Sequence, residues 1–287
     1  MNKKIYNLMD WAAIEEIVYA EAAHPEKMLG AHTVGGYTLV QAFFPDSKSV
    51  SISIDGADSA RGKTVKEEIV MELQDEAGYY AALLKGKNRR DYSYYVTYAD
   101  KKRKPKQYKE VYGDYKVLSD DDIDTIMSGS CEDVYDKLGA RKMTLGGVRG
   151  TGFAVYAPNS YRVSVVGDFN NWDGRTHQMI KDDVSGIYTL FVPGVEAGEK
   201  YKYEILIKGG EKLLRVDPYA KESEDGGDAS IVSSPLTYKW TDAKWIENRK
   251  KLGEVPGRMN IYEICASTLG ADGNYKSITS LVLSHVK

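Results

Sequence analysis

Residues 153–173 decide the fold of this chain and read Phe153-Ala-Val-Tyr-Ala-Pro-Asn-Ser-Tyr-Arg-Val-Ser-Val-Val-Gly-Asp-Phe-Asn-Asn-Trp-Asp173. The segments 152–156 and 162–166 are rich in β-branched and aromatic residues, which favour extended structure. They predict two short strands. The second strand ends at Gly167, and two amide side chains and an indole follow on a polar turn.

The pattern around this stretch occurs twice in the chain. Four short motifs recur in the same order, and the residue numbers within each pair differ by 108 to 113. The pairs are Leu29-Gly-Ala31 with Leu138-Gly-Ala140, Pro45-Asp-Ser-Lys-Ser-Val-Ser-Ile52 with Pro158-Asn-Ser-Tyr-Arg-Val-Ser-Val165, Gly78-Tyr-Tyr80 with Gly186-Ile-Tyr188, and Tyr92-Ser-Tyr94 with Tyr201-Lys-Tyr203. Self-similarity at a nearly constant period is typical of a repeated structural unit. The sequence therefore predicts two copies of one β-sandwich.

Short strands and turns fill most of both copies, as is typical of a sandwich. The further strands are expected at 37–44, 50–54, 69–73, 79–84, 92–98, 187–192, 201–207 and 231–232. The strand at 50–54 is expected to end in a turn at Asp55-Gly56. A helix over 6–23, capped by Asp10, precedes the first copy, and short helices over 119–137 connect the two copies.

The last segment, residues 243–287, has a different character. Met259-Asn-Ile-Tyr-Glu-Ile-Cys265 is expected to form a buried strand, and Asn274 is expected to cap a helix that carries Ile278, Leu281, Val282 and His285. One strand and one helix cannot bury their own apolar faces, so further structure is expected to cover them. The predicted domains are therefore 1–117, 118–242 and 243–287.

The composition limits the classes of partner. The 287 residues include 39 Lys and Arg against 42 Asp and Glu, and the resulting net charge of -3 argues against nucleic acid. No apolar run approaches the roughly 20 residues that span a bilayer, so no membrane partner is expected, and the N-terminus does not resemble a secretory signal. The two cysteines, Cys131 and Cys265, lie far apart and suggest no disulfide framework, so a cytoplasmic location is expected.

The turn at 167–173 carries the strongest candidates for a binding site. Indole rings stack on the C–H faces of sugars and amides hydrogen-bond hydroxyls, so Trp172, Asn170 and Asn171 are candidate sugar-binding residues. Lys202 lies on a strand of the same copy and is a candidate for reaching a sugar hydroxyl beside Trp172. The alternative is that Trp172 packs on its own sandwich, that the asparagines only shape the turn, and that Lys202 is solvated.

No set of residues predicts catalysis, a metal site or a cofactor. The four histidines, His24, His32, His177 and His285, lack metal-ligand spacing, and neither a nucleophile elbow nor a carboxylate pair stands out. The glycine-rich segment 146–152 precedes a strand and not a helix, so it is not expected to bind phosphate. The basic run 101–106 contains no aromatic residue and is expected to be a solvated loop.

These motifs resemble the family-48 carbohydrate-binding module of bacterial 1,4-α-glucan (glycogen) branching enzymes. The resemblance rests on residues 153–159, 163–175, 201–204 and 217–220. The preceding copy, with His24-Pro25 and Leu29-Gly-Ala-His32, is similar to the extra N-terminal sandwich of the longer enzymes, and residues 133–140 are similar to their connector. Residues 259–263 and 274–287 resemble the first strand and first helix of their catalytic barrel, of glycoside hydrolase family 13.

The resemblance implies two tandem immunoglobulin-like β-sandwiches with short helical connectors, followed by an incomplete first β/α unit of a (β/α)8 barrel. Cys265-Ala-Ser-Thr-Leu269 departs from the family, which has His-Leu-Gly-Ser-Trp at this end of the strand, the end that faces a barrel's active site. The family's catalytic carboxylates lie on later barrel strands. No residue of this chain inherits their roles, and the chain alone is expected to be inactive.

In related modules a Trp at the position of Trp172 and a Lys at the position of Lys202 contact α-glucan. A second stacking Trp of some related modules would fall near Leu213-Leu214 and is absent here. The resemblance therefore implies either weak glucan binding or a site that serves mainly to dock on the barrel.

The function that the resemblance implies is that of the non-catalytic, α-glucan-binding and domain-docking portion of a branching enzyme of glycogen biosynthesis. The parent reaction transfers an α-1,4-glucan chain to a 6-hydroxyl. The expected partners are α-glucan and a catalytic barrel. One alternative is a stand-alone glycogen-binding or regulatory module, against which the apolar Ile278, Leu281 and Val282 argue. Another is a docking protein that only packs on a barrel supplied by another chain.

Overall fold

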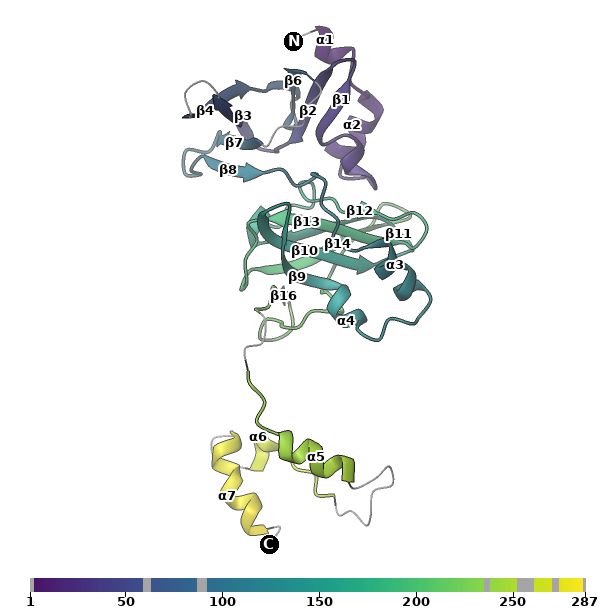
Figure 1. The fold of residues 1–287 in the computed structure, drawn as a ribbon, viewed down its shortest axis with the longest axis vertical. Helices are drawn as coiled ribbons and strands as arrows, with labels where there is room; N and C mark the ends of the chain where they lie inside the picture. The colour runs from purple at the N-terminus through teal and green to yellow at the C-terminus, as the bar shows by residue number, and fades with distance from the viewer. Residues whose placement is uncertain are drawn as a thin grey trace. The chain divides into compact units, whose positions relative to one another are not determined.

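The computed structural model describes residues 3–58, 63–86, 92–234, 238–251, 261–269 and 274–285. Contacts divide the chain into two units, Met1–Pro235 and Leu236–Lys287. All strands of the described residues belong to the first unit and form four antiparallel sheets of four strands each (Figure 1). The fold of this unit is therefore mainly β, as the sequence predicts.

The first sheet pair consists of β1 to β8. One of its sheets has the order β1-β2-β6-β5 and the other the order β4-β3-β7-β8. The strands are β1 (Gly30–Val34), β2 (Tyr37–Phe43), β3 (Ser47–Asp58), β4 (Lys63–Val70), β5 (Glu72–Asp75), β6 (Tyr79–Lys85), β7 (Tyr92–Tyr98) and β8 (Lys106–Lys109). Val40 and Ala82 from one sheet share a buried cluster with Ile52, Tyr94 and Val96 from the other. The two sheets therefore face each other across one core.

The second sheet pair consists of β9 to β16. One sheet has the order β12-β13-β10-β9, and the other has the order β11-β14-β15 with β16 also pairing with β14. The strands are β9 (Gly139–Leu145), β10 (Val148–Tyr156), β11 (Ser160–Gly167), β12 (Ile180–Lys181), β13 (Ile187–Pro193), β14 (Lys200–Ile207), β15 (Lys212–Arg215) and β16 (Ser230–Ile231). Phe153 and Tyr188 from one sheet share a core with Val163, Val165 and Tyr201 from the other.

Short helices precede each sheet pair. They are α1 (Lys3–Tyr6), α2 (Trp11–Val18) and the 3-10 turn η1 (Pro25–Lys27) before β1, and α3 (Asp120–Met127) and α4 (Val134–Lys137) before β9. Asp10 caps α2 as predicted, because its carboxylate accepts a hydrogen bond from the Ala13 amide at 3.3 Å. The predicted helix over 6–23 is too long. Ala20 has a left-handed backbone with φ 58, and such a residue stops a helix.

The repeated motifs of the sequence make matching contacts. The Ser47 hydroxyl donates to the Phe44 carbonyl at 2.6 Å in the first sheet pair. In the second, the Ser160 hydroxyl donates to the Ala157 carbonyl, also at 2.6 Å. The repeat in sequence is therefore also a repeat in local structure.

Several strand boundaries differ from the prediction. β3 does not end at Asp55-Gly56, because its pairing with β4 continues to the pair Asp58 and Lys63. The predicted strand 69–73 is divided between β4 and β5 at Met71, which is buried in the core of the first sheet pair. The strands β1, β8, β9, β12 and β15 lie outside the predicted ranges. They are short or rich in charged residues, so their pattern is weak.

The second unit is helical where it is described, with α5 (Ala243–Lys251), α6 (Ala266–Leu269) and α7 (Tyr275–His285). The helix predicted after Asn274 is confirmed, and the Asn274 side chain accepts from the Ser277 amide at 2.9 Å. The strand predicted over 259–265 is not confirmed. Met259 and Asn260 lie outside the described residues, and residues 261–265 form no strand. Ile261 is 84% exposed, and no strand among the described residues of this unit can pair with it.

None of the described helices combines the length and the apolar character that crossing a bilayer requires.

Candidate functional site

The loop 167–173 joins β11 to the segment before β12, and Asn170 shapes it from within. This loop begins with a short 3-10 turn, η2 (Asp168–Asn170). The Asn170 carbonyl oxygen accepts from the Gly167 amide at 2.9 Å, and its NH2 group donates to the Val165 carbonyl at 3.0 Å. Asn170 is only 8% exposed. Its amide is therefore occupied in holding the loop, which matches the structural alternative for this residue.

Two left-handed residues follow and present an indole at the surface. Asn171 has φ 54 and Trp172 has φ 61. Such backbone costs a bulky residue on the order of 1–3 kcal/mol and persists only where the surroundings impose it. Here the Trp172 amide donates to the Gly167 carbonyl at 3.0 Å, and its indole N–H donates to the Asp168 carboxylate at 3.2 Å. The Trp172 side chain is thus fixed in place while the residue remains 38% exposed.

Lys202 lies on the outer face of β14, close in register to this loop. It pairs with Val166, and its neighbour Tyr201 pairs with Gly167, where the loop starts. Tyr201 and Tyr203 are fully buried in the core, so Lys202 between them faces outward. Asp168 also accepts from the Lys200 amide at 3.2 Å, which ties the loop to β14.

The predicted position for a second aromatic ring, near Leu213-Leu214, lies in β15 and carries aliphatic side chains. Leu214 pairs with Glu204 across β14 and β15 and is 52% exposed, and Val216 just beyond β15 is 45% exposed. Because facing residues of paired strands share a face, Leu214 lies on the same outer face as Lys202 and Glu204. This face therefore offers apolar contact but no second aromatic ring at that position.

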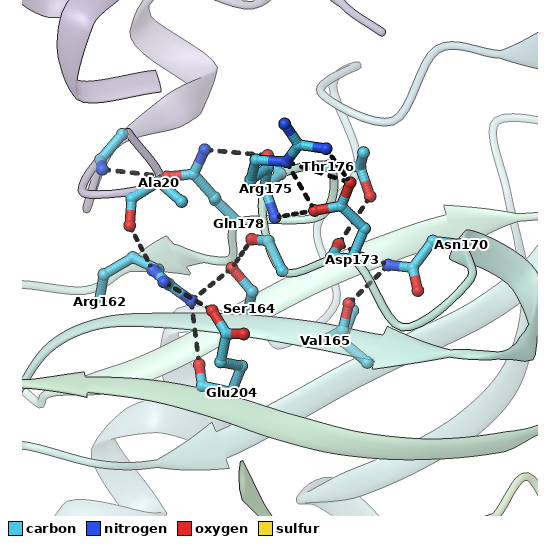
Figure 2. Close-up of polar contacts among 12 residues, drawn as sticks. Ala20, Arg162, Ser164, Val165, Asn170, Asp173, Arg175, Thr176, Gln178 and Glu204 are labelled. Carbon is cyan, nitrogen blue, oxygen red and sulfur yellow. Dashed lines mark hydrogen bonds and ion pairs between the residues drawn. The ribbon is translucent and has the colours of Figure 1, made fainter. Parts of the chain in front are cut away.

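The other end of this outer face is covered by the N-terminal segment. Arg162 is fully buried, and its guanidinium pairs with the Glu204 carboxylate at 2.8 Å. It also donates to the Ser164 hydroxyl at 2.9 Å and to the Ala20 carbonyl at 2.8 Å (Figure 2). Arg162 therefore links β11 and β14 to the turn after α2.

Gln178 makes a second link between the two sheet pairs. Its amide oxygen accepts from the Ala22 amide at 3.0 Å, and its NH2 group donates to the Ile17 carbonyl at 3.0 Å. Gln178 is fully buried, and its own carbonyl accepts from the Tyr112 hydroxyl at 3.0 Å. Neither Arg162 nor Gln178 is among the candidate residues that the sequence predicts. Each has partners more than 100 positions away, at Ala20 for Arg162 and at Ile17 and Ala22 for Gln178, and no local pattern signals these contacts.

Charged and titratable groups on the segment after Trp172 are also held in place. Burial opposes ionisation of Asp173, but hydrogen bonds from Arg175 outweigh it and keep the pKa of this carboxyl below its usual range. Burial lowers the pKa of His177 to about 4, so the ring is neutral at pH 7. No group of three or more His, Cys, Asp or Glu among the described residues could hold a metal ion.

Comparison with known proteins defines the class first. The sequence model of carbohydrate-binding module 48 (isoamylase N-terminal domain) matches residues 137–220, which include β9 to β15 and the Trp172 loop. Residues 10–112 match the alpha-1,4-glucan branching enzyme GlgB, N-terminal domain. The second sheet pair thus matches the carbohydrate-binding module 48 family, and the first matches the N-terminal domain found in branching enzymes.

Whole-chain relatives give the family. The 1,4-alpha-glucan branching enzyme GlgB of Rhodospirillum rubrum is 33% identical over 287 residues, covering 97% of this chain and 37% of the relative. The enzyme of Rubrobacter xylanophilus is 36% identical over 254 residues, covering 88% of this chain and 33% of the relative. The chain therefore belongs to the family of 1,4-alpha-glucan branching enzymes, and it spans about a third of the length of these relatives. Among solved structures, type I pullulanase of Bacillus subtilis in complex with maltose is 19% identical, with a TM-score of 0.31 over 74% of this chain and 27% of that chain.

Proposed function

We propose that this chain is the non-catalytic, α-glucan-binding and domain-docking portion of a 1,4-α-glucan branching enzyme. The observation that carries the proposal is the indole of Trp172 in a domain that matches family 48. One backbone and one side-chain hydrogen bond hold this residue at the surface. In this proposal the two sheet pairs are immunoglobulin-like sandwiches, and residues 243–287 belong to the start of a family-13 barrel. The location is cytoplasmic, where glycogen is made.

Trp172 supplies the stacking surface in this proposal, and Lys202 and Asn171 supply polar contacts. A half-exposed indole offers an apolar face to the C–H groups of a glucose ring. Lys202 stands on the outer face of β14 next to the start of the loop, and Asn171 is exposed beside Trp172. Asn170 does not contact sugar in this proposal, because its amide holds the loop through hydrogen bonds to Gly167 and Val165.

The parent reaction, transfer of an α-1,4-glucan chain to a 6-hydroxyl, needs two carboxylates on either side of the glycosidic bond. We assign no such role to any residue of this chain. The described carboxylates near Trp172 have structural partners: Asp168 binds the indole N–H, and Asp173 binds Arg175. The chain alone is therefore expected to retain glucan without branching it, as one part of a glycosyltransferase.

Retention of the 287-residue chain in glycogen-containing native gels tests the proposal. Trp172→Ala removes the stacking ring and is expected to weaken retention by about tenfold or more, which corresponds to about 1.4 kcal/mol or more of binding free energy. The matched control is Trp245→Ala, which removes an indole that is 60% exposed on α5, and it is expected to leave retention unchanged.

Equal retention of Trp172→Ala and the unmodified chain would contradict the binding role. It would favour the alternative in which these sheets only dock on a barrel. Thermal unfolding of both variants in the same buffer shows whether a loss of retention comes from loss of fold.

A further inference from the structure

A cavity of about 420 Å3 lies between the Trp172 loop and the first sheet pair. The proposed function does not use it. Its walls come from the end of β2, from β7 and β8, and from the loop itself, and include Phe44, Tyr98, Tyr108, Phe169 and Asn171. A volume of this size is within the range of about 300–1,000 Å3 that small-molecule sites occupy. The cavity therefore has room for a ligand of one or a few rings.

The aromatic wall of the cavity is held by contacts among its own members. The rings of Phe44 and Tyr108 lie 5.5 Å apart between centroids. The hydroxyls of Tyr98 and Tyr108 are 2.6 Å apart, and the Arg103 guanidinium lies 3.7 Å above the Tyr98 ring. Lys106 lies 5.0 Å over the Tyr108 ring, so one face each of Tyr98 and Tyr108 faces a cation, and the wall is aromatic, the kind of surface on which sugar rings stack.

The loop supplies uncharged polar groups to the same cavity. The Asn170 NH2 group lies 2.9 Å from Nδ1 of His177, and because Asn170 is the donor, the ring proton sits on Nε2. Neither Nε2 of His177 nor the side-chain amide of Asn171 hydrogen-bonds any described residue. The low pKa of His177 leaves its ring neutral at pH 7, so it donates without adding charge.

The charges around the cavity argue against an anionic ligand. Asp46, Glu110 and Asp173 line it together with Arg103 and Lys109, and Arg175 pairs with Asp46 at 3.7 Å and with Asp173 at 2.8 Å, so the charges balance. A phosphate or carboxylate ligand would find no net positive charge here, whereas a neutral polyol meets both donors and acceptors. Aromatic faces combined with neutral donors and carboxylate acceptors fit a sugar best.

We propose that this cavity is a second glucan subsite that takes the end of an α-glucan chain, about one or two glucose units long. The inference rests on the proposed function. Phe169, Asn171 and Asp173 line the cavity, and Trp172 on the same loop is exposed. One loop thus serves two subsites, a surface for the side of a chain and a cavity for its end.

Two probes separate the subsites in the intact 287-residue chain. β-Cyclodextrin is a closed ring of glucose units without ends, so it can stack on an exposed indole but cannot enter a cavity of this size. Maltose has free ends and fits both. Trp172→Ala is expected to weaken β-cyclodextrin binding by about tenfold or more and to leave maltose binding within about twofold.

Tyr98→Ala is expected to have the opposite effect and to weaken maltose binding alone. Its matched control is Tyr95→Ala on the same strand, because Tyr95 is 43% exposed and does not line the cavity. Nuclear magnetic resonance of the imidazole of His177 adds a measurement that needs no cavity variant. Maltose is expected to shift this resonance in the unmodified chain and in Trp172→Ala.

The failures are distinguishable. If Trp172→Ala abolishes binding of both probes, the cavity subsite is overturned and the Trp172 surface stands. If Tyr98→Ala removes maltose binding while Trp172→Ala changes neither probe, the cavity stands and the Trp172 surface is overturned. An unshifted His177 resonance in saturating maltose would overturn the cavity subsite whatever the variants do.

Discussion

The two sheet pairs share one construction for anchoring their tyrosines. In the first, the Glu110 carboxylate accepts hydrogen bonds from the hydroxyls of Tyr92, at 2.6 Å, and Tyr94. In the second, the Asp217 carboxylate accepts from the hydroxyls of Tyr201, at 2.7 Å, and Tyr203, at 3.2 Å. The two carboxylates lie 107 residues apart and do the same work, one in each copy. The scaffold of the repeat therefore does not explain why only one copy is a glucan-binding candidate.

A glycine beside each carboxylate, Gly30 near Glu110 and Gly139 near Asp217, is a second feature that the two copies share. Gly30 and Gly139 have φ 93 and 88, which favour glycine. An added Cβ would lie 3.1 Å from the Tyr112 carbonyl oxygen in the first copy and 3.0 Å from the Tyr219 carbonyl oxygen in the second. The Leu-Gly-Ala motif recurs in the sequence because both copies bring the chain this close at the same point.

The copies differ where β3 and β11 end. β3 continues past Ile54 to Asp58 and pairs with β4. At the corresponding point in the repeat, β11 ends at Gly167 and the chain turns through Trp172. A Cβ on Gly167 would lie 2.3 Å from the Lys200 carbonyl oxygen, so a larger residue could not make this close approach. The lesson is that the scaffold is common to both copies and the candidate site arises from one strand ending early.

The largest effect is expected at a position where the copies differ in burial. Arg162 is fully buried and donates four hydrogen bonds to three residues, whereas its counterpart in the repeat, Ser49, is exposed and its hydroxyl bonds Thr97 at 2.7 Å. Arg162→Ala leaves the Glu204 carboxylate without its ion-pair partner, and we expect a loss of about 3–5 kcal/mol in the free energy of unfolding. Urea denaturation followed by circular dichroism measures it.

Ser49→Ala is the matched control and is expected to change the free energy of unfolding by less than about 0.5 kcal/mol. Equal effects at the two positions would mean that the buried network of Figure 2 does not stabilise the contact between the sheet pairs.

The contrast between buried Arg162 and exposed Ser49 also shows which features the sequence predicts and which it does not. The strands around 153–166, the cap at Asp10 and the turn at 167–173 follow from local patterns, because β-branched alternation, a capping side chain and a turn motif are each read within a few residues. The burial of Arg162 depends on Ala20, which comes from another part of the chain. The strand expected over 259–265 follows from the sequence pattern and the family resemblance, but a strand also needs a partner to satisfy its backbone groups.

A smaller loss in the free energy of unfolding is expected at acidic pH. Burial lowers the pKa of His177 to about 4, whereas an unfolded histidine titrates near 6.5, so the unfolded state binds the additional proton between these values. The contribution of His177 to the free energy of unfolding is therefore fully present above pH 6.5. It is lost as the pH drops from 6.5 towards 4, by at most about 1.4 kcal/mol per pH unit. Urea denaturation at pH 7 and pH 5 measures the loss.

His177→Gln keeps a side chain that can accept from Asn170 but does not titrate, and it is expected to remove this part of the pH dependence. Because the pKa of Asp173 lies below its usual range, the contribution of Asp173 to the free energy of unfolding is lost only at lower pH. It does not change between pH 7 and pH 5. A variant with the same loss between pH 7 and pH 5 would show that another group is responsible.

The smallest effect tests the likeness of the copies. Tyr94→Phe and Tyr203→Phe each remove one hydroxyl that donates to the shared carboxylate, Glu110 in the first copy and Asp217 in the second. Both tyrosines are buried, and each change is expected to cost about 0.5–1.5 kcal/mol, since the carboxylate keeps its other tyrosine. Urea denaturation of the two variants should give losses that agree within experimental error. A loss confined to one copy would mean that the matching contacts are a likeness of geometry and not of energetics, and that the two carboxylates hold their sheets by different means.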